Sequence, residues 1–264
     1  MRIVTLLSDF GNRDQYVAEM KGTILSLCPS AVIVDTAHEI EKFNIRMGAL
    51  ALAAAARYFP EGTIHVAVVD PGVGGVRRDL LIESNHFVFL GPDNGLLIPA
   101  ASQDGIKGVY SIENPEFMRN PVSSTFHGRD VFAYVAGRIA AGAELPQVGP
   151  RVTDPVQAAF PQAVAYAGRL ACQVLVTDSF GNIVTTAREG DLEVAGIETG
   201  ASVKMRCGRR VFGLDVRRSY SDSIGGRGLL LVGSHGFLEI ALNKASAARR
   251  FRMRPGDELM FTSG

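Results

Sequence analysis

The sequence predicts an α/β fold in which an N-terminal three-layer, Rossmann-like α/β domain precedes a smaller C-terminal antiparallel β-barrel-like domain. Three observations lead to this prediction. Short apolar segments alternate with helical patterns in the N-terminal part, short strands separated by Gly, Asp, Asn and Ser turns dominate after residue 161, and prolines gather between the two parts. Repeated β-α-β units build helix-covered sheets, whereas closely spaced short strands build antiparallel sheets or barrels.

The strands of the N-terminal part are expected at five places. Three short apolar segments, over 3–7, 31–35 and 63–69, are bounded by polar, Gly or Pro residues and suit buried strands. Two further apolar segments, 80–84 and 87–90, are separated by Asn-His and predict a hairpin. The first three strands are separated by helical segments, which is the pattern of right-handed crossovers.

Helices are expected between these strands and after them. Asp14 is a candidate N-cap for a first helix that ends before Pro29. Asn44 is a candidate N-cap for an alanine-rich second helix that ends near Phe59. A third helix is predicted from Gly128 to about residue 141.

The C-terminal part has a different pattern, with a single helical segment over 244–250. We expect domains over 1–155 and 162–264, joined by a linker at about 148–161 that contains three prolines. The predicted strands of the second domain are 170–177, 183–186, 203–207, 211–216, 229–232, 237–241 and 259–261.

Composition bounds the possible partners and the compartment. The 27 basic and 27 acidic residues give zero net charge, which disfavours a nucleic-acid or anionic-membrane partner. The chain has an odd number of cysteines, three, and none of them has C-x-x-C spacing. We therefore expect reduced thiols at Cys28, Cys172 and Cys207. No signal-peptide core is apparent, and the longest apolar run, 47–56, is too short for the ~20 residues that span a bilayer. The sequence therefore predicts a cytoplasmic protein.

The most informative segment, residues 66–78, is an apolar strand that ends at Asp70 and continues into a glycine-rich turn. Ligands of open α/β sheets bind outside the carboxyl ends of such strands. Arg77 can fold back toward Asp70 across a turn with almost no side chains, so the two residues form a candidate catalytic pair. The alternative interpretation is a structural ion pair that only holds the loop closed.

A second polar cluster, residues 123–130, precedes the third predicted helix. His127 lies where the chain turns into that helix, and a neutral imidazole there can orient or deprotonate a water molecule. The alternative is a solvated loop histidine. Arg129 and Asp130 are expected to cap the helix or to pair on its surface.

Several common motifs are missing from the sequence. Residues 72–75 lack the G-x-G-x-x-G spacing, and no G-x-x-x-x-G-K-[ST] segment occurs, so a dinucleotide or triphosphate cradle is not predicted. Neither H-E-x-x-H nor G-x-S-x-G is present, which disfavours a zincin and an α/β-hydrolase. None of the five histidines has metal-ligand spacing, and no metal site is predicted.

Two segments, 7–12 and 176–182, echo each other because each places an Asp at a strand end beside a Phe and a Gly-Asn turn. Asp9, Asp178 and Phe180 are therefore candidate contacts for one flat, polar ligand, unless the echo reflects ordinary turn chemistry. Phe10 and Phe180 can enclose a base between them or pack in the core, and for Phe10 the core is favoured.

A third cluster spans residues 233–243. Ser234 and Glu239 can hydrogen-bond a base or an amino acid from a loop and its following strand. The alternative is a simple β-turn followed by an edge strand with an outward glutamate.

Six motifs occur in a fixed order along almost the whole chain. They are Ser8-Asp9-Phe10-Gly11, Val69-Asp70-Pro71-Gly72-Val73-Gly74, Gly91-Pro92-Asp93-Asn94-Gly95, Thr125-Phe126-His127-Gly128-Arg129-Asp130, Asp178-x-Phe180-Gly181-Asn182 and Ser234-x-x-x-Leu238-Glu239-Ile240-Ala241. On these motifs the chain resembles the S-adenosyl-L-methionine hydroxide adenosyltransferase family, which is related to the fluorinase and the chlorinase.

The resemblance implies both an architecture and a reaction. Family members combine an N-terminal α/β domain with a C-terminal β-barrel-like domain. They form trimers in which the ligand lies between the N-terminal domain of one subunit and the C-terminal domain of its neighbour. They hydrolyse S-adenosyl-L-methionine to adenosine and L-methionine, so this molecule is the substrate and no separate cofactor is expected.

The resemblance also implies roles for individual residues. The catalytic trio of the family corresponds to Asp70, Arg77 and His127. The adenosine-contacting positions correspond to Asp9, Asp70, Asn182, Ser234 and Glu239.

These residue types suit the implied reaction. The sulfonium of the substrate is already a good leaving group, so the missing component is a nucleophile at C5′ of the ribose. Arg77 beside His127 can favour hydroxide and hold it in line with the C–S bond. Asp70 can orient Arg77 and the water or hold the ribose hydroxyls, and Asp9 is the better candidate to bind the ribose diol. Placement of this kind lowers a barrier by roughly 7–11 kcal/mol without a covalent intermediate.

Two other functions remain open from the sequence. A halide-using relative would make 5′-halo-5′-deoxyadenosine, but it would replace the charged pair with small or neutral groups. A non-catalytic adenosine or S-adenosyl-L-methionine sensor would keep the pocket without turnover. The presence of both Arg77 and His127 favours water as the nucleophile.

Overall fold

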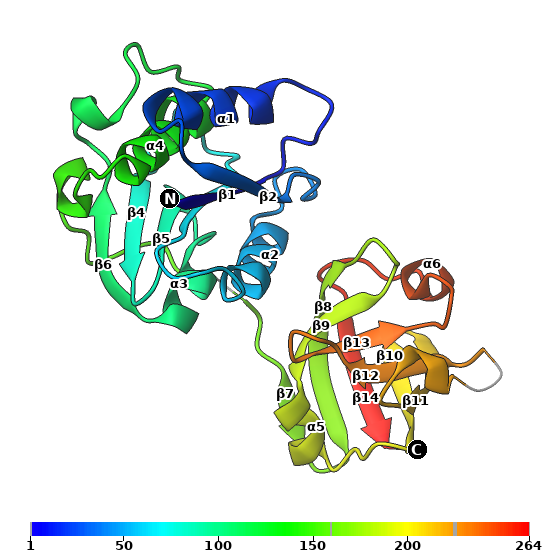
Figure 1. Cartoon of the computed structure of the whole chain (residues 1–264). Coiled ribbons are helices and arrows are strands. Elements are labelled where there is room, and N and C mark those ends of the chain that lie inside the picture. The colour runs from blue at the N-terminus through cyan, green and yellow to red at the C-terminus, as the bar shows by residue number, and fades with distance from the viewer. Residues whose placement is uncertain (1, 159, 224–225, 264) are drawn as a thin grey trace. The chain divides into compact units, whose positions relative to one another are not determined.

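The computed structural model describes residues 2–158, 160–223 and 226–263. The chain divides into two compact units, Met1–Ala159 and Phe160–Gly264, and Figure 1 shows the elements of each. Ala159, which falls in the linker predicted at about 148–161, lies outside the described residues. Each unit is described on its own below.

The first unit is built on a six-stranded mixed sheet. Its strands lie in the order β2 (Val32–Ala37), β1 (Ile3–Ser8), β3 (Ile64–Val68), β5 (Val88–Pro92), β4 (Asp79–Ser84) and β6 (Ile106–Ser111). The first four strands in this order run parallel, and for β2, β1 and β3 the strand-helix alternation predicts this arrangement. Strand β4 pairs antiparallel with both β5 and β6, so the hairpin prediction is confirmed. Strand β6 was not anticipated from the sequence.

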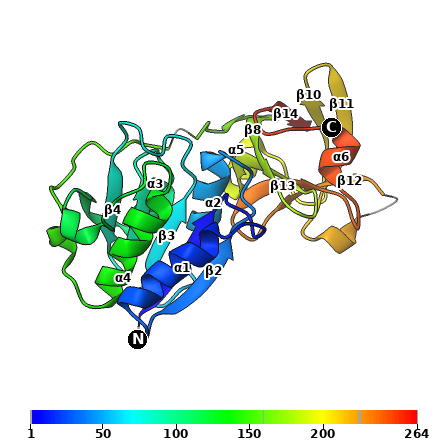
Figure 2. The ribbon, with the colours of Figure 1, turned by 90° about the horizontal axis from the view of Figure 1, so that it is seen from above.

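Helices cover both faces of this sheet and complete the three predicted layers. Helices α1 (Tyr16–Leu27) and α4 (Tyr134–Ala140) pack together on one face, and Figure 2 shows them side by side. On the other face lies α2 (Ile45–Ala56), whose Gly48 approaches the Leu7 and Val69 side chains, together with the short helix α3 (Ile98–Asp104). Buried apolar side chains of the strands fill the space between the layers.

The helix starts test the capping predictions. Asn44 caps α2, because its side-chain Oδ1 accepts a hydrogen bond from the Met47 backbone N–H at 3.0 Å. The prediction for Asp14 was wrong: Gln15 is the N-cap of α1, and no side chain caps it. The third predicted helix begins as the π-helix η2 (Gly128–Ala133) before it continues as α4, and π-helical turns occur often at functional sites.

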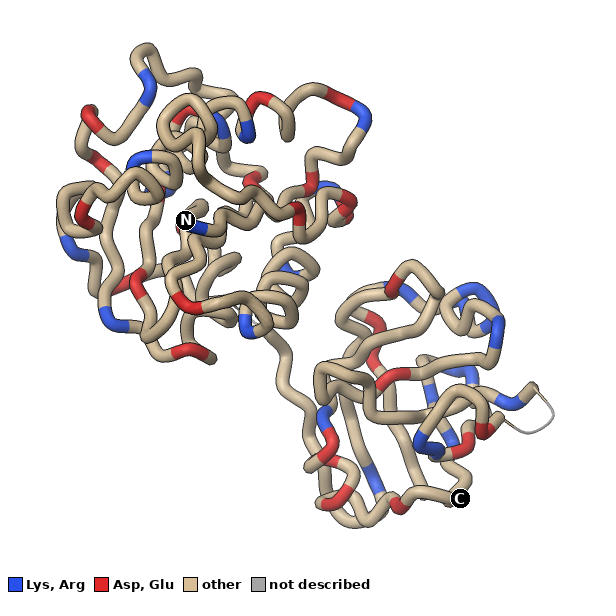
Figure 3. The backbone as a smooth tube through the Cα atoms, in the orientation of Figure 1, with Lys and Arg blue, Asp and Glu red and all other residues tan. Residues whose placement is uncertain are grey.

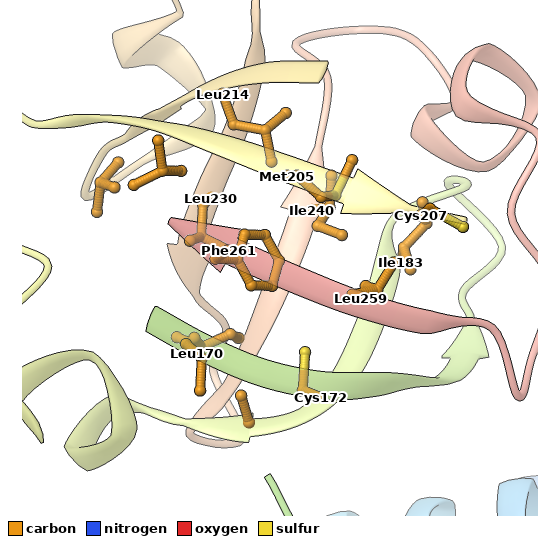
Figure 4. Close-up of a cluster of buried hydrophobic side chains, with 14 of the residues drawn as sticks. Leu170, Cys172, Ile183, Met205, Cys207, Leu214, Leu230, Ile240, Leu259 and Phe261 are labelled. Carbon is orange, nitrogen blue, oxygen red and sulfur yellow. The ribbon is translucent and has the colours of Figure 1, made fainter. Parts of the chain in front are cut away.

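The second unit is a closed β-barrel, in agreement with the predicted fold class. Strand β14 pairs with both β10 and β8, which closes seven strands into a ring, while β7 pairs with β8 outside it. Figure 4 shows the buried apolar side chains inside the barrel. The strands are β7 (Val164–Tyr166), β8 (Arg169–Thr177), β9 (Ile183–Arg188), β10 (Ser202–Cys207), β11 (Arg210–Val216), β12 (Gly228–Val232), β13 (Phe237–Ala241) and β14 (Glu258–Ser263).

Two details of the barrel differ from the sequence expectation. Strands β11 and β12 run parallel, although every other pair in the barrel is antiparallel, because the connection between them returns to the strand start. A helix, α5 (Glu189–Ala195), follows β9 in addition to the predicted helical segment, which forms α6 (Ala247–Phe251). The seven residues of α5 are too few for a clear helical period in the sequence.

The zero net charge of the chain conceals an opposite charge on each unit. Residues 1–159 contain 13 Lys and Arg against 17 Asp and Glu, whereas residues 160–264 contain 14 against 10. Figure 3 shows where these residues lie along the backbone. Among the described residues, no helix combines the length and apolarity needed to cross a bilayer.

A buried histidine gives the first unit a predicted pH dependence. His65, the second residue of β3, is 1% exposed, bonds Thr5 Oγ1 through Nδ1 at 2.8 Å and stacks on Phe89. Burial lowers the pKa of His65 from 6.5 to about 4, although the Asp104 charge opposes this shift. The neutral ring therefore stabilises the fold above pH 6.5, and this contribution is lost as the pH falls toward 4. Between pH 7 and pH 5 we expect the free energy of unfolding to drop by about 2 kcal/mol from this group.

Urea denaturation at several pH values tests this expectation. The variant His65→Leu lacks the titrating group and should lose that part of the pH dependence, whatever its absolute stability. An equal slope for the variant and the natural chain over pH 5–7 would contradict the prediction.

Candidate active site

The predicted pair Asp70–Arg77 forms at the carboxyl end of β3. Asp70 follows this fully buried strand, and its side chain is only 4% exposed. The turn hydrogen bonds Val73 N–H to Asp70 O and Gly75 N–H to Gly72 O reverse the chain. Arg77 consequently returns to Asp70, where its Nε lies 2.9 Å from each carboxylate oxygen and its Nη2 also donates to Oδ2. The glycine turn thus serves to bring these two side chains together.

A second carboxylate, which sequence reasoning missed, also binds Arg77. Asp79 is the first residue of β4, and its Oδ1 accepts a hydrogen bond from Arg77 Nη1 at 2.5 Å. The Arg77 side chain is 10% exposed and that of Asp79 is 11% exposed. Burial alone would lower the pKa of Arg77, but the hydrogen bonds and charges of Asp70 and Asp79 outweigh it and raise this pKa. Arg77 is therefore a fully charged guanidinium between two carboxylates.

His127 lies against the same group of side chains. It immediately precedes η2, and its Nδ1 is 2.9 Å from Asp79 Oδ2 and 3.3 Å from Arg77 Nη2. Its loop also touches the glycine turn, since a Cβ placed on Gly74 would lie 2.1 Å from the carbonyl oxygen of Ser124. The structure thus brings Asp70, Arg77 and His127 together, with Asp79 joining the last two.

Asp9 lies at the same edge of the sheet. It follows β1, which pairs with β3 so that Ser8 is opposite Val68, and Asp9 and Asp70 therefore extend neighbouring parallel strands. The Asp9 residue is 6% exposed, and its Oδ2 accepts a hydrogen bond from the Phe43 backbone N–H at 2.9 Å. No donor among the described residues bonds its Oδ1.

Two features around Asp9 were not found from the sequence. Phe43 has a positive φ of 65° and a side chain on the surface, since the residue is 69% exposed, although it directly contacts Asp9 through its backbone. Below the loop, Ser8 Oγ bonds His38 Nδ1 at 2.8 Å and accepts the Phe10 N–H at 3.3 Å. These contacts fix the loop that carries Asp9, and a strained, exposed aromatic residue beside a buried carboxylate is a signal for function.

The two predicted aromatic residues have different surroundings. Phe10 packs against Tyr16 and Phe126, with ring centroids 5.7 and 5.8 Å away, which agrees with its expected place in the core. Phe180, in contrast, is 81% exposed. An exposed phenyl ring of this kind is available to stack on a flat ligand.

In the second unit, Asp178 and Asn182 form one compact turn. The Asp178 carboxylate accepts hydrogen bonds from the backbone N–H groups of Phe180 and Asn182 and from Asn182 Nδ2, at 2.8–3.0 Å. Asp178 therefore fixes the orientation of the Asn182 amide, whose Oδ1 atom accepts no hydrogen bond from the part of the chain that the structure describes. We therefore infer that Asp178 positions the side chain of Asn182.

Glu239 lies on β13 and has a partner that the sequence did not reveal. The Tyr220 hydroxyl, in the 3-10 turn η4 (Tyr220–Asp222), donates to Glu239 Oε2 at 2.9 Å. Burial raises the pKa of Glu239, helped by the Asp178 charge and opposed by the Tyr220 hydrogen bond. Burial and the Glu239 carboxylate together raise the pKa of Tyr220 to about 12. Ser234 lies in the turn between β12 and β13, so the predicted residues of this unit come from neighbouring elements.

A glycine beside Glu239 allows its position to be tested. A Cβ on Gly233 would lie 1.9 Å from Glu239 Oε1, while the Gly233 backbone has no positive φ that would strain another residue. The variant Gly233→Ala should fold normally but displace the flexible carboxylate from its site. If Glu239 binds substrate, we expect KM to rise roughly tenfold, the loss of one hydrogen bond of about 1–1.5 kcal/mol.

Steady-state kinetics would measure this change. Gly190→Ala is the matched control, because its new Cβ would meet no atom within 4 Å. An unchanged KM for Gly233→Ala would show that the carboxylate is not needed for binding.

Comparisons with known proteins match both units. The family model described as "SAM hydroxide adenosyltransferase N-terminal domain" matches residues 4–149, and the corresponding C-terminal domain model matches residues 172–260. A crystal structure of an uncharacterized conserved protein from Thermotoga maritima is 33% identical, with a TM-score of 0.92 and coverage of 98% of this chain and 99% of that chain.

Named relatives have similar lengths. The chain is 34% identical to an (R)-S-adenosyl-L-methionine hydrolase of Salinispora arenicola, over 99% of this chain and 98% of the relative. It is 36% identical to a protein of the same name from Thermus thermophilus, over 97% of this chain and 98% of the relative. A fluorinase from Nocardia brasiliensis is 27% identical, over 96% of this chain and 94% of that protein.

Proposed function

Because the chain belongs to the SAM hydroxide adenosyltransferase family, we propose that it is an S-adenosyl-L-methionine hydrolase that forms adenosine and L-methionine. The observation that carries this proposal is the similarity of 33–36% identity, over nearly the whole chain, to relatives named (R)-S-adenosyl-L-methionine hydrolase. The charged cluster of Asp70, Arg77 and His127 supports it, since such a cluster can place and activate a water molecule.

The reaction depends on a well-placed nucleophile, and it needs no general acid. The positively charged sulfur of the substrate leaves as the neutral thioether of methionine, so its departure needs no proton. Water in line with the C5′–S bond attacks C5′, and Asp70, Arg77 and His127 position this water. We propose no separate cofactor, because the substrate itself carries the activated leaving group.

The remaining predicted residues bind the substrate. Asp9, with one carboxylate oxygen not used by the protein backbone, accepts hydrogen bonds from the ribose hydroxyls. Asn182, Ser234 and Glu239 supply hydrogen bonds to the base or to the amino-acid part. Phe180 stacks on the base, and Asp178 acts by holding the Asn182 amide.

We also propose that the protein works as a homotrimer in which neighbouring subunits share each site. The opposite net charges of the two units support such an assembly, because the acidic first unit of one copy attracts the basic second unit of another. Analytical ultracentrifugation would determine the oligomeric state. A cytoplasmic location is supported by the three buried free thiols.

Incubation with S-adenosyl-L-methionine in ¹⁸O-labelled water tests the function. The labelled oxygen should appear in the 5′-hydroxyl of adenosine, and methionine should form in equal amount. Parallel reactions with chloride and fluoride test the halide alternative, for which a 5′-halogenated nucleoside would be the product. Tight binding with no product would instead indicate a sensor.

A further inference from the structure

Asp79 links the arginine and the histidine of the proposed catalytic cluster. Building on the proposed hydrolase activity, we propose that Asp79 is a positioning residue that fixes His127 as the general base for the attacking water. Neither the six sequence motifs nor the predicted trio includes Asp79. The inference rests on which proton each nitrogen of His127 carries.

The contacts of Asp79 assign the proton on the imidazole. Asp79 Oδ2 lies 2.9 Å from His127 Nδ1, and a carboxylate can only accept a hydrogen bond, so Nδ1 must carry the proton. The Arg77 Nη2 atom, 3.3 Å from the same nitrogen, then cannot donate to it. Nε2 of His127 consequently keeps its lone pair, and no protein group among the described residues hydrogen-bonds to it. With its side chain 17% exposed, His127 can present this lone pair to water.

The charges around His127 favour its action as a general base over the binding of a preformed hydroxide ion. Asp70 and Asp79 carry two negative charges against the single positive charge of Arg77, so the cluster with a neutral imidazole has a net charge of −1. An added hydroxide would meet this excess negative charge at close range in a poorly solvated site. A proton transferred to His127 would instead neutralise the excess. This proposal differs from the sequence interpretation, in which Arg77 favoured hydroxide, because that interpretation lacked Asp79.

The resulting step is balanced in atoms and electrons. The water oxygen forms a bond to C5′ while its proton moves to His127 Nε2. The C5′–S bond breaks, and its electron pair stays on sulfur, which becomes the thioether of methionine. The imidazolium keeps its Nδ1–H bond to Asp79, and the Nε2 proton leaves to solvent after the products depart.

Asp79→Asn gives the sharpest test of this role. Arg77 has only N–H donors, so the single oxygen of the new side-chain amide would turn to Arg77 and its NH₂ group would face His127. Nδ1 would then become an acceptor, and Nε2 would carry the proton and lose its function as a base. We expect kcat to fall at least about 100-fold with KM changed less than about threefold, as for loss of a general base.

Two further variants distinguish the positioning of His127 by Asp79 from a purely structural role of the Asp79 side chain. Asp79→Glu keeps both carboxylate oxygens, so its kcat should be higher than that of Asp79→Asn. The kcat of Asp79→Ala should be at most slightly higher than that of Asp79→Asn. Asn is closest to Asp in shape, so a merely structural role would instead make Asp79→Asn the mildest change. Arg77 retains Asp70 in every variant, and thermal melting checks that each one folds. The control Asp154→Asn removes an exposed carboxylate from the neighbouring Arg78 and should leave kcat unchanged.

A solvent isotope measurement adds an independent readout. Proton transfer from water in the rate-determining step predicts that the natural enzyme is slower in D₂O, whereas a stored hydroxide predicts no such slowing. Normal turnover by Asp79→Asn, or an equal rate in both solvents, would overturn the role of Asp79. Failure of the natural enzyme to place ¹⁸O in adenosine would overturn the proposed function itself, so the two failures are distinguishable.

Discussion

Replacing Arg77 with alanine is expected to lower kcat by about 10²–10³-fold while KM changes little. Arg77 is not itself one of the proposed substrate contacts; it holds Asp70 and Asp79 in the positions that order the water and His127. Removal of one well-placed donor from a poorly solvated site has an effect of this size on turnover. Initial rates of adenosine formation against substrate concentration would separate kcat from KM.

Folding must be monitored in this experiment. Without Arg77, two carboxylates that are 4% and 11% exposed would lose their cation, and breaking such buried pairs costs about 3–5 kcal/mol of stability. Arg77→Lys retains the charge but not the planar fork that reaches both carboxylates, so it should fold better and still lose most turnover. Arg78→Ala, which affects the adjacent pairs to Asp93 and Asp154, is the control that should retain turnover. Wild-type kcat in a folded Arg77→Ala protein would rule out the proposed role of Arg77.

Replacing Gly74 with alanine is expected to have an effect of similar size for a different reason. The new Cβ would lie 2.1 Å from the backbone carbonyl oxygen of Ser124, so the Arg77 turn and the His127 loop would have to separate. A displacement of about 1 Å between catalytic groups can reduce turnover 100-fold. Steady-state kinetics of the variant would show the loss of kcat. Thermal melting would show that the accompanying loss of stability is small by comparison.

Gly62 offers a matched control for the backbone contribution. It has a φ of 80°, close to the 73° of Gly74, but a Cβ there would meet no atom within 4 Å. Gly62→Ala thus reproduces the conformational strain of about 1 kcal/mol without the collision. If both variants keep full turnover, close contact between the two loops is unnecessary for activity.

The sequence predicted the main architecture because its signals are local. The apolar strand before Asp70, the Asn44 cap and the hairpin over 80–90 each depend on a few consecutive residues, and the structure contains all three. The prediction that Asp14 caps α1 was wrong because several polar residues precede this helix. Only the conformation of the folded loop determines which of them occupies the N-cap position.

The missed parts depend on contacts between distant residues. Asp79 looks like an ordinary first residue of a hairpin strand, and its importance arises only because His127, 48 positions later, packs against it. Likewise, Tyr220, in the connection between β11 and β12, bonds Glu239 on β13, and no sequence spacing marks this pair. Conversely, Asp178 stood out in the sequence as a ligand contact, but its carboxylate is occupied by the turn that it stabilises.

The closure of the barrel has a consequence for how the protein folds during synthesis. The strand that completes the ring, β14, pairs Phe261 with Leu170 of β8, and these residues are separated by most of the second unit. The ribosome must therefore release β14 before the barrel can close, while the first unit has all of its strands much earlier. Contacts between such distant segments slow folding. Until then, β8 and β10 expose unpaired strand edges of the kind that promote aggregation.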